Sequence, residues 1–348
     1  MTSWQSGGLA VAAAFISTCS LAQAQTAAPA TSQLTLYGVV DMAAESVSTG
    51  AGRTLRAESG VLAGSRWGVR GSEDLGGGLR ALYVMEAGLN ADTGERGQGG
   101  LAFGRQIFVG MGGDWGQLTV GRHYTTFHTS LASYALTGLI WGNAANYFRD
   151  GTVLRADNSL RFQSASMAGL VVRGMYSFGE NADTNVGRQF GGSLDYTRGP
   201  WSLGASLWER RTTAQNTDRY RLLGGSYDFK LARAALLLST REDDLPDAAS
   251  KRGRFFEASM TIPVSAAGQV LLSYGQFQGR ARANSDARAL SVRYDHALSK
   301  RTKLYAGVSA IRNEADAAFT INSASNAGPS VPKGSKPRSL LVGISHSF

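Results

Sequence analysis

Short segments in which apolar side chains alternate with small or polar ones recur from one end of the chain to the other, for example at residues 33–41, 79–88, 170–178, 201–207 and 289–296. This period of two places successive side chains on opposite faces of a β-strand. Sixteen such segments can be counted. After residue 24 there is no run of 18 apolar residues of the kind that forms a membrane-spanning helix. The pattern predicts an all-β fold with many strands.

The connections between these segments alternate in length. Short turn signals occur at 74–78, 113–116, 168–169, 199–200, 266–268 and 299–302, and longer polar loops lie between them, the longest covering roughly 125–156. Sixteen strands enclose an aqueous lumen when the sheet closes. A soluble sandwich would have fewer strands, and a propeller or β-helix would show a repeated motif. We therefore expect a 16-stranded antiparallel transmembrane β-barrel with turns at one rim and loops at the other.

The N-terminal segment predicts export from the cytoplasm. Residues 9–16 are apolar and rich in alanine, and Ala22-Gln23-Ala24 has the form of a cleavage site. Residues 1–24 contain no lysine or arginine, which departs from the usual basic start of such a signal. We expect a cleaved signal peptide at 1–24 and one barrel domain at 25–348. Cleavage would remove Cys19, the one cysteine of the chain, and so excludes a disulfide framework.

The C-terminal segment is itself a strand that runs to the last residue. Leu340, Val342, Ile344, His346 and Phe348 share one face, while small residues occupy the other. Because chain ends are usually polar and frayed, this end predicts a strand that closes the sheet, with the ring of Phe348 at a membrane interface.

Five segments, in collinear order, resemble the β-proteobacterial branch of the Gram-negative general (diffusion) porin family. They are LTLYGVVD at 34–41, GSRWGVRGSEDLGGGL at 64–79, FGRQIFVGMG with GQLTVGRHY at 103–124, DNSLRF at 157–162, and the terminal SHSF. The resemblance implies a homotrimeric barrel in the outer membrane of a Gram-negative bacterium, surrounded by lipid and lipopolysaccharide, whose third loop folds inward. It also implies that Phe348 is read by the barrel assembly machinery of that membrane.

Arginines are the candidate residues of the pore. Alternation places Arg66 and Arg161 on the lumenal face, whereas the parity of Arg105 is ambiguous and only the resemblance places it there. These three match the constriction arginines of the family, and Arg155 is a looser candidate. Alternation predicts further lumenal charge at Arg70, Arg173, Arg233, Arg241 and Arg293.

The third loop distinguishes this chain. Residues 125–148 contain no aspartate or glutamate, so we expect the arginines to give the channel an anion preference. Tyr134 and Trp141 either line the narrow passage or pack the loop onto the inner wall. By family resemblance, Asp92 and Glu95 are candidates for a subunit contact, with Arg122 as a partner across the interface.

The sequence therefore predicts a passive diffusion channel for small anionic or neutral hydrophilic solutes. A channel specific for an organic acid, a sugar or an amino acid is the main alternative, and an adhesin or structural barrel is another. We expect no enzyme, metal or cofactor, because the four histidines show no catalytic spacing and HExxH, CxxC and phosphate-loop motifs are missing. The net charge of +9 is scattered rather than clustered, which argues against a nucleic-acid partner.

Overall fold

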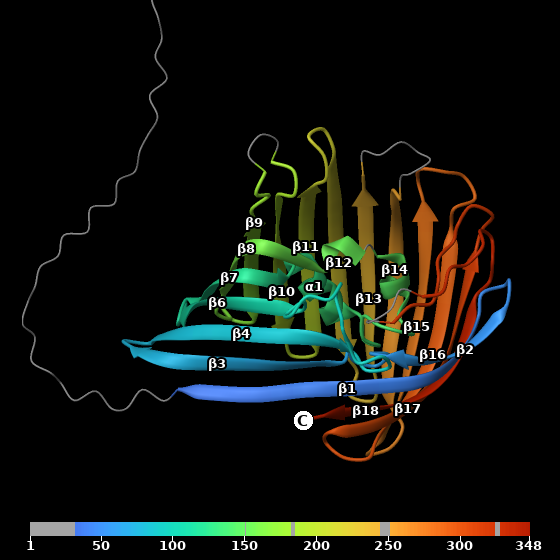
Figure 1. Ribbon diagram of the computed structural model, residues 1–348, viewed down its shortest axis with the longest axis horizontal. Helices are drawn as coiled ribbons and strands as arrows, with labels where there is room; N and C mark the ends of the chain where they lie inside the picture. Colours follow the sequence, from blue (N-terminus) through green and yellow to red (C-terminus); the bar gives the residue numbers. More distant parts are fainter. Residues whose placement is uncertain (1–31, 150, 182–184, 244–250, 324–327) are drawn as a thin grey trace, which may run out of the picture.

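The strands form one sheet that closes on itself. The structure, a computed structural model, describes residues 32–149, 151–181, 185–243, 251–323 and 328–348, so the predicted signal peptide lies outside the described residues. Neighbouring strands are antiparallel, and the last strand pairs with the first (Figure 1). The strands are β1 (Gln33–Ser48), β2 (Arg53–Ser59), β3 (Arg66–Gly76), β4 (Leu79–Asn90), β5 (Glu95–Arg96), β6 (Gln106–Gly113), β7 (Gly116–Tyr124), β8 (Arg155–Ser164), β9 (Leu170–Ser177), β10 (Gln189–Arg198), β11 (Trp201–Arg211), β12 (Thr217–Asp228), β13 (Arg233–Glu242), β14 (Gly253–Pro263), β15 (Gly268–Gly279), β16 (Ala287–Ala297), β17 (Thr302–Asn313) and β18 (Arg338–Ser347).

These eighteen elements occupy sixteen positions in the wall. Strand β1 pairs with β3 along its first half and with β2 along its second half, so β2 and β3 share one position. Between them the chain leaves the ladder, and the carboxylate of Asp41 accepts the backbone N–H groups of Val61 and Leu62 at 2.6 and 3.0 Å. Strand β5 has two residues and pairs only with β4. The predicted 16-stranded barrel is confirmed.

The two faces of the wall differ as the alternation predicts. On β18, Leu340, Val342 and Ile344 are 57%, 56% and 46% exposed, whereas Leu341 is 1% exposed and Ser345 is 6% exposed. Similar exposed apolar side chains occur on the outward positions of the other long strands. In a membrane these outward side chains contact lipid, which removes the cost of leaving them in water.

The two rims of the barrel differ in their connections. Short turns at 199–200, 229–232, 264–267 and 298–301 lie at one rim, and the longer segments 212–216 and 280–286, together with the described residues 314–323 and 328–337, lie at the other. The longest segment joins β7 to β8 and contains α1 (Thr126–Tyr134), α2 (Ala144–Phe148) and the 3-10 helix η1 (Gly151–Val153). None of the helices in the described part of the chain is long and apolar enough to cross a membrane.

The closing contact joins the two ends of the described chain. Register runs from Val39 opposite Ser347 to Ser48 opposite Arg338. Beyond the register, Gly38 and Phe348 exchange two backbone hydrogen bonds of 3.1 Å. The ring of Phe348 lies against Gly38 so closely that a Cβ there would be 2.2 Å from a ring carbon. The terminal segment therefore closes the sheet, and a glycine is needed where the last ring lies on β1.

Candidate functional site

The segment 125–154 crosses the inside of the barrel. It starts at β7, yet α1 contacts β9 to β13 and α2 contacts β14 to β16, on the other side of the ring (Figure 1). Its two ends are held together by Thr125, whose hydroxyl donates to the carbonyl of Val153 at 2.6 Å and accepts the N–H of His128 at 3.0 Å as the N-cap of α1. We call this segment the inner loop.

A buried carboxylate on β14 attaches the inner loop to the wall. Glu257 is 1% exposed. One of its oxygens accepts the side-chain amide of Asn143 at 2.7 Å, and the other accepts the backbone N–H of Ala145 at 2.7 Å. The neighbouring N–H of Ala144 donates to Ser273 on β15 at 3.0 Å. Because unpaired polar groups are costly when buried, this set of bonds fixes the position of α2.

Tyr134 and Trp141 are also attachment points. The indole N–H of Trp141 donates to Glu45 and to Ser339, at 3.1 Å each, and the ring is 0% exposed. The hydroxyl of Tyr134 donates to Asp195 at 3.2 Å, and its ring is 1% exposed. A side chain that lines a water-filled passage must reach water, and these two rings do not. Their burial fits the alternative in which they pack the inner loop onto the wall.

On the side of the wall formed by β1, β3, β4 and β6, two predicted arginines share one carboxylate. Glu86 on β4 lies 3.3 Å from the Nε of Arg66 and 2.9 Å from the Nε of Arg105, and it accepts the hydroxyl of Tyr37 at 3.0 Å. The sequence reasoning missed Glu86. Its parity in 79–88, opposite Tyr83 and Met85, would have placed it on the lumenal face.

A second group of cations surrounds an aromatic pair at the root of the inner loop. Arg155 donates to the hydroxyl of Tyr124 at 2.9 Å, and its guanidinium carbon lies 4.6 Å from the ring centroid. Arg105 approaches the same ring, at 5.9 Å, and His128 stacks on it at 4.8 Å. Loss of hydration lowers the pKa of His128 well below its ordinary value, and the charges of Arg149, Arg155 and Arg105 lower it further. The imidazole is therefore neutral at neutral pH.

Arg161 stands apart from this group. It lies further along β8, within electrostatic range of Arg173. Within the described residues its side chain makes no ion pair, and its Nε is buried without a hydrogen-bond acceptor. The structure thus connects Arg66, Arg105 and Arg155 through Glu86 and Tyr124 but does not bring Arg161 into contact with them.

The remaining predicted arginines mostly have acidic partners on neighbouring wall positions. Arg173 pairs with Asp195 at 2.5 Å, Arg293 with Asp295 at 2.7 Å, and Arg241 lies 3.8 Å from Asp243. Arg233 donates to Ser226 at 2.9 Å, and Arg70 lies 5.2 Å from the ring centroid of Tyr37. These carboxylates come from the wall and not from the inner loop, which is why an inspection of the loop alone did not find them.

The residues predicted at a subunit contact lie at two places in the structure. Asp92, in the turn that follows β4, and Glu95, the first residue of β5, are both exposed. Arg122 forms an ion pair with Asp157 of its own chain, and both residues border an outward groove beside Val109 and Val120. A partner across an interface therefore remains a prediction for all three.

Three comparisons identify what this barrel resembles. A family model described as "Gram-negative porin" matches residues 8–316. Outer membrane porin protein 32 of Delftia acidovorans is 30% identical over 342 residues, which cover 92% of this chain and 96% of that protein.

Two solved structures agree with this assignment. The anion-selective porin from Comamonas acidovorans superposes with a TM-score of 0.82 at 28% identity, over 91% of this chain and all (100%) of that one. A trimer form of OmpT from Vibrio cholerae has a TM-score of 0.67 at 16% identity and covers 91% of this chain and 99% of that one, which supports the fold alone. With its closed 16-stranded wall, this chain belongs to the Gram-negative porin family and is an outer-membrane porin.

Proposed function

We propose that the protein is a passive diffusion channel for small hydrophilic solutes, with a preference for anions set by Arg66, Arg105, Arg155 and Arg161. A porin selects by the sign of the fixed charge at its narrowest part, because low-dielectric walls focus the field of that charge on the solute. The relative from Comamonas acidovorans is named as anion-selective, and this supports the same preference here.

The observation that carries the proposal is a difference between the acidic and the basic side chains of the lumen. Glu45 and Glu257 are 0% and 1% exposed and are bound by donors of the inner loop. In contrast, Arg155 and Arg161 have no carboxylate partner among the described residues. Solutes that cross the lumen therefore meet cationic side chains that the acidic residues leave uncompensated.

Planar-bilayer recordings in a KCl gradient test the proposal. The reversal potential of the unmodified protein should report a preference for chloride, and the triple variant Arg66→Gln, Arg105→Gln, Arg161→Gln should lose most of it. A preference for potassium in the unmodified channel would refute the function. An unchanged reversal potential in the triple variant would refute only the choice of these three residues.

We also propose that the working unit is a homotrimer. The resemblance to the porin family implies this assembly, and the OmpT structure, which shares the fold, is described as a trimer form. Size-exclusion chromatography with light scattering of the detergent-solubilised protein measures it directly. A monomer that conducts ions normally would contradict the trimer without affecting the channel proposal.

A channel specific for organic anions is the second candidate, and one cavity favours it. A cavity of about 390 Å³ beside the inner loop is lined by Phe277, Phe319, Lys251 and Arg282, among other residues. The two rings are 4.8 Å apart. Aromatic rings next to cations suit a carboxylate that carries an apolar group. Saturable block of chloride current by an aromatic carboxylate, with none by acetate, would favour this candidate over general diffusion.

A further inference from the structure

The segment that follows β17 folds back into the loop-side mouth of the barrel. Asn313, the last residue of β17, is 6% exposed, and its side chain exchanges two hydrogen bonds with the backbone of Phe319, at 2.9 Å each. Further along, Ser323 donates to the buried carboxylate of Glu58 on β2. We call residues 314–323 the return segment. These contacts with two separate strands fix its position against the wall.

The return segment also contacts the inner loop. The side-chain amide of Asn146 on α2 donates to Asn322 at 2.8 Å. The ring of Phe319 lies 5.1 Å from the ring of Phe148 on α2 and 4.8 Å from the ring of Phe277 on β15. Phe148 and Phe277 are 4% and 7% exposed, whereas Phe319 is only partly buried. The three rings therefore form one aromatic surface, of which Phe319 is the accessible part.

A cavity of about 390 Å³ lies over this aromatic surface. It is bounded by α2, by the return segment and by residues next to the loop-side ends of β14 and β15. The cavity therefore lies between the inner loop and the rim that carries the long loops. Its volume is within the range that is usual for pockets that bind small molecules.

The lining of the cavity is cationic. Asp316 is the one carboxylate among the described lining residues, and it forms an ion pair with Lys333 at 3.1 Å. Lys251 and Arg282 are exposed, and within the described part of the chain their side chains make no ion pair or hydrogen bond. These two cations are available to a ligand. The basic residues of the lining are Arg149, Arg241, Lys251, Arg252, Arg282 and Lys333.

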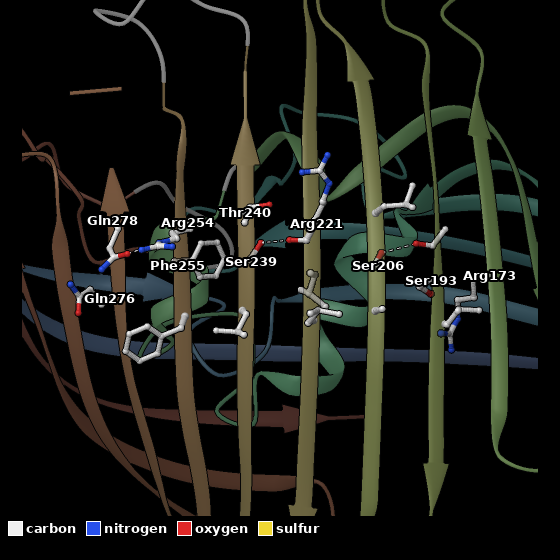
Figure 2. A pocket seen from close by; sticks show the side chains of 18 of the residues that line it. Arg173, Ser193, Ser206, Arg221, Ser239, Thr240, Arg254, Phe255, Gln276 and Gln278 are labelled. Carbon is white, nitrogen blue, oxygen red and sulfur yellow. Dashed lines mark hydrogen bonds between the residues drawn. The ribbon is translucent and has the colours of Figure 1, made fainter. Parts of the chain in front are cut away.

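A groove on the other face of the wall differs from this cavity. It has a volume of about 990 Å³ and lies over the outward side chains of Leu207 and Leu223. Figure 2 shows Arg221 and Arg254 along the loop side of this groove. A solute inside the lumen does not reach these groups, because the wall separates them from it. The cavity beside the return segment instead brings aromatic and cationic groups together on the lumenal side.

We propose that this cavity binds anions that carry an aromatic ring, with the ring against Phe319 and the anionic group at Lys251 and Arg282. Aromatic rings pack on one another edge-to-face or offset, and ammonium and guanidinium groups bind a carboxylate with charge-assisted hydrogen bonds. A carboxylate without a ring lacks the first contact, and a neutral ring lacks the second. The inference rests on the second candidate function, a channel for organic anions, and assigns its ligand class and its binding residues.

Calorimetric titration of the detergent-solubilised protein at pH 7 tests the ligand class, after subtraction of titrations into detergent alone. Benzoate should bind saturably. Acetate, which has the charge and no ring, and benzyl alcohol, which has the ring and no charge, should each bind at least about fivefold more weakly. Equal affinity for benzoate and acetate would overturn the recognition of a ring. Equal affinity for benzoate and benzyl alcohol would overturn the recognition of charge.

Two variants test the residues. Lys251→Gln, Arg282→Gln removes the two available cations and should weaken benzoate binding about five- to tenfold. The matched control Lys300→Gln, Arg301→Gln removes two exposed cations at the turn rim and should leave the affinity unchanged. Phe319→Leu keeps an apolar side chain but removes the ring, and it should weaken binding about three- to tenfold.

Unfolding temperatures in detergent check that each variant is folded. Because Lys251 and Arg282 are exposed, the double variant tests the site even if Phe319→Leu is unstable. Unchanged benzoate affinity in the double variant, or an equal loss in the turn-rim control, would overturn the assignment to this cavity.

The titration does not depend on transport, so it separates this inference from the proposed function. No benzoate binding in a channel that prefers chloride would overturn the inference and leave the diffusion channel in place. Benzoate binding without block of the chloride current would support the site and refute only the organic-anion channel.

Discussion

The two sides of the lumen use charge in opposite ways. Where the inner loop meets the wall, Glu45 and Glu257 are buried and accept hydrogen bonds from Trp141, Asn143 and Ala145. Where the loop leaves the wall, arginines gather around Glu86 and Tyr124, and several keep part of their surface in water. In the proposed channel, these acidic residues hold the inner loop and the arginines face the solute. Under that proposal the sign of the net charge in the lumen depends on which charges the loop covers, more than on the number of each.

Truncation of Trp141 should cause the largest loss of stability, because this side chain attaches the inner loop to the wall. Trp141→Ala deletes a fully buried ring and the donor to Glu45 and Ser339, and such truncations cost about 3–5 kcal/mol. Trp141→Phe keeps the ring and should lose about 1–2 kcal/mol. Thermal unfolding in detergent measures both. Equal unfolding temperatures for the two variants would show that the indole N–H, and not the packing, holds the loop.

Substitution of Glu257 tests whether the only role of this buried side chain is to attach the inner loop to the wall. Glu257→Ala removes the acceptor of the N–H of Ala145 and leaves the side-chain amide of Asn143 with Thr137 alone, so it should destabilise the loop by about 2–3 kcal/mol. We expect larger and noisier single-channel conductance because α2 is released from β14. Glu257→Gln keeps one acceptor oxygen and should change conductance less. A strong shift of ion selectivity at constant conductance would mean that Glu257 acts on the solute as well.

The arginine side should respond in selectivity and not in stability. Arg161→Gln removes a cation with no carboxylate partner and should lower the chloride-to-potassium permeability ratio by roughly two- to fivefold. Arg66→Gln should lower it less, because Glu86 already compensates that charge. Glu86→Gln should raise the ratio, since it uncovers two arginines. A larger effect at Arg66 than at Arg161 would break the proposed link between pairing and selectivity.

The smallest predicted effect is a pH dependence of stability that comes from His128, at the root of the inner loop. The pKa of His128 is lower in the folded protein than in the unfolded chain, so the folded state binds fewer protons. Its contribution to stability is complete above its ordinary pKa of 6.5 and is lost as the pH falls below that value, by at most about 1.4 kcal/mol per pH unit. Arg105, Arg149, Arg155 and Tyr124 are the charged or titratable groups around it.

Unfolding midpoints measured from pH 7 to pH 5 check this dependence. His128→Phe should flatten the loss of stability, whereas His346→Phe, on the outer face, should not. If both variants keep the slope of the parent protein, His128 is not its source.

Local patterns were enough for the wall but not for the loop. Alternation predicts the strands, their two faces and the closing strand, because side-chain direction in a strand depends only on parity. It would also have found Glu86, had the acidic residues been assigned to faces as the arginines were. The pairing of Arg173 with Asp195 depends on strand register, and the bond from Trp141 to Glu45 joins residues 96 positions apart. No period in the sequence encodes such contacts.

The exit of the chain from the ladder at 60–65 was also missed. Its cause is Asp41, which accepts two backbone N–H groups of that segment in place of a strand partner. A buried aspartate needs hydrogen-bond donors, but the sequence alone does not show that they come from the backbone of residues 61 and 62.

The pairing of β1 with β18 has a consequence for how the protein is made. The register joins Val39 to Ser347, almost the full length of the described chain apart, and contacts of such sequence separation form late. Until Phe348 has emerged and reached Gly38, both edge strands present unpaired backbone groups that favour aggregation. A chain that lacks β18 therefore leaves the facing edges of β1 and β17 unpaired.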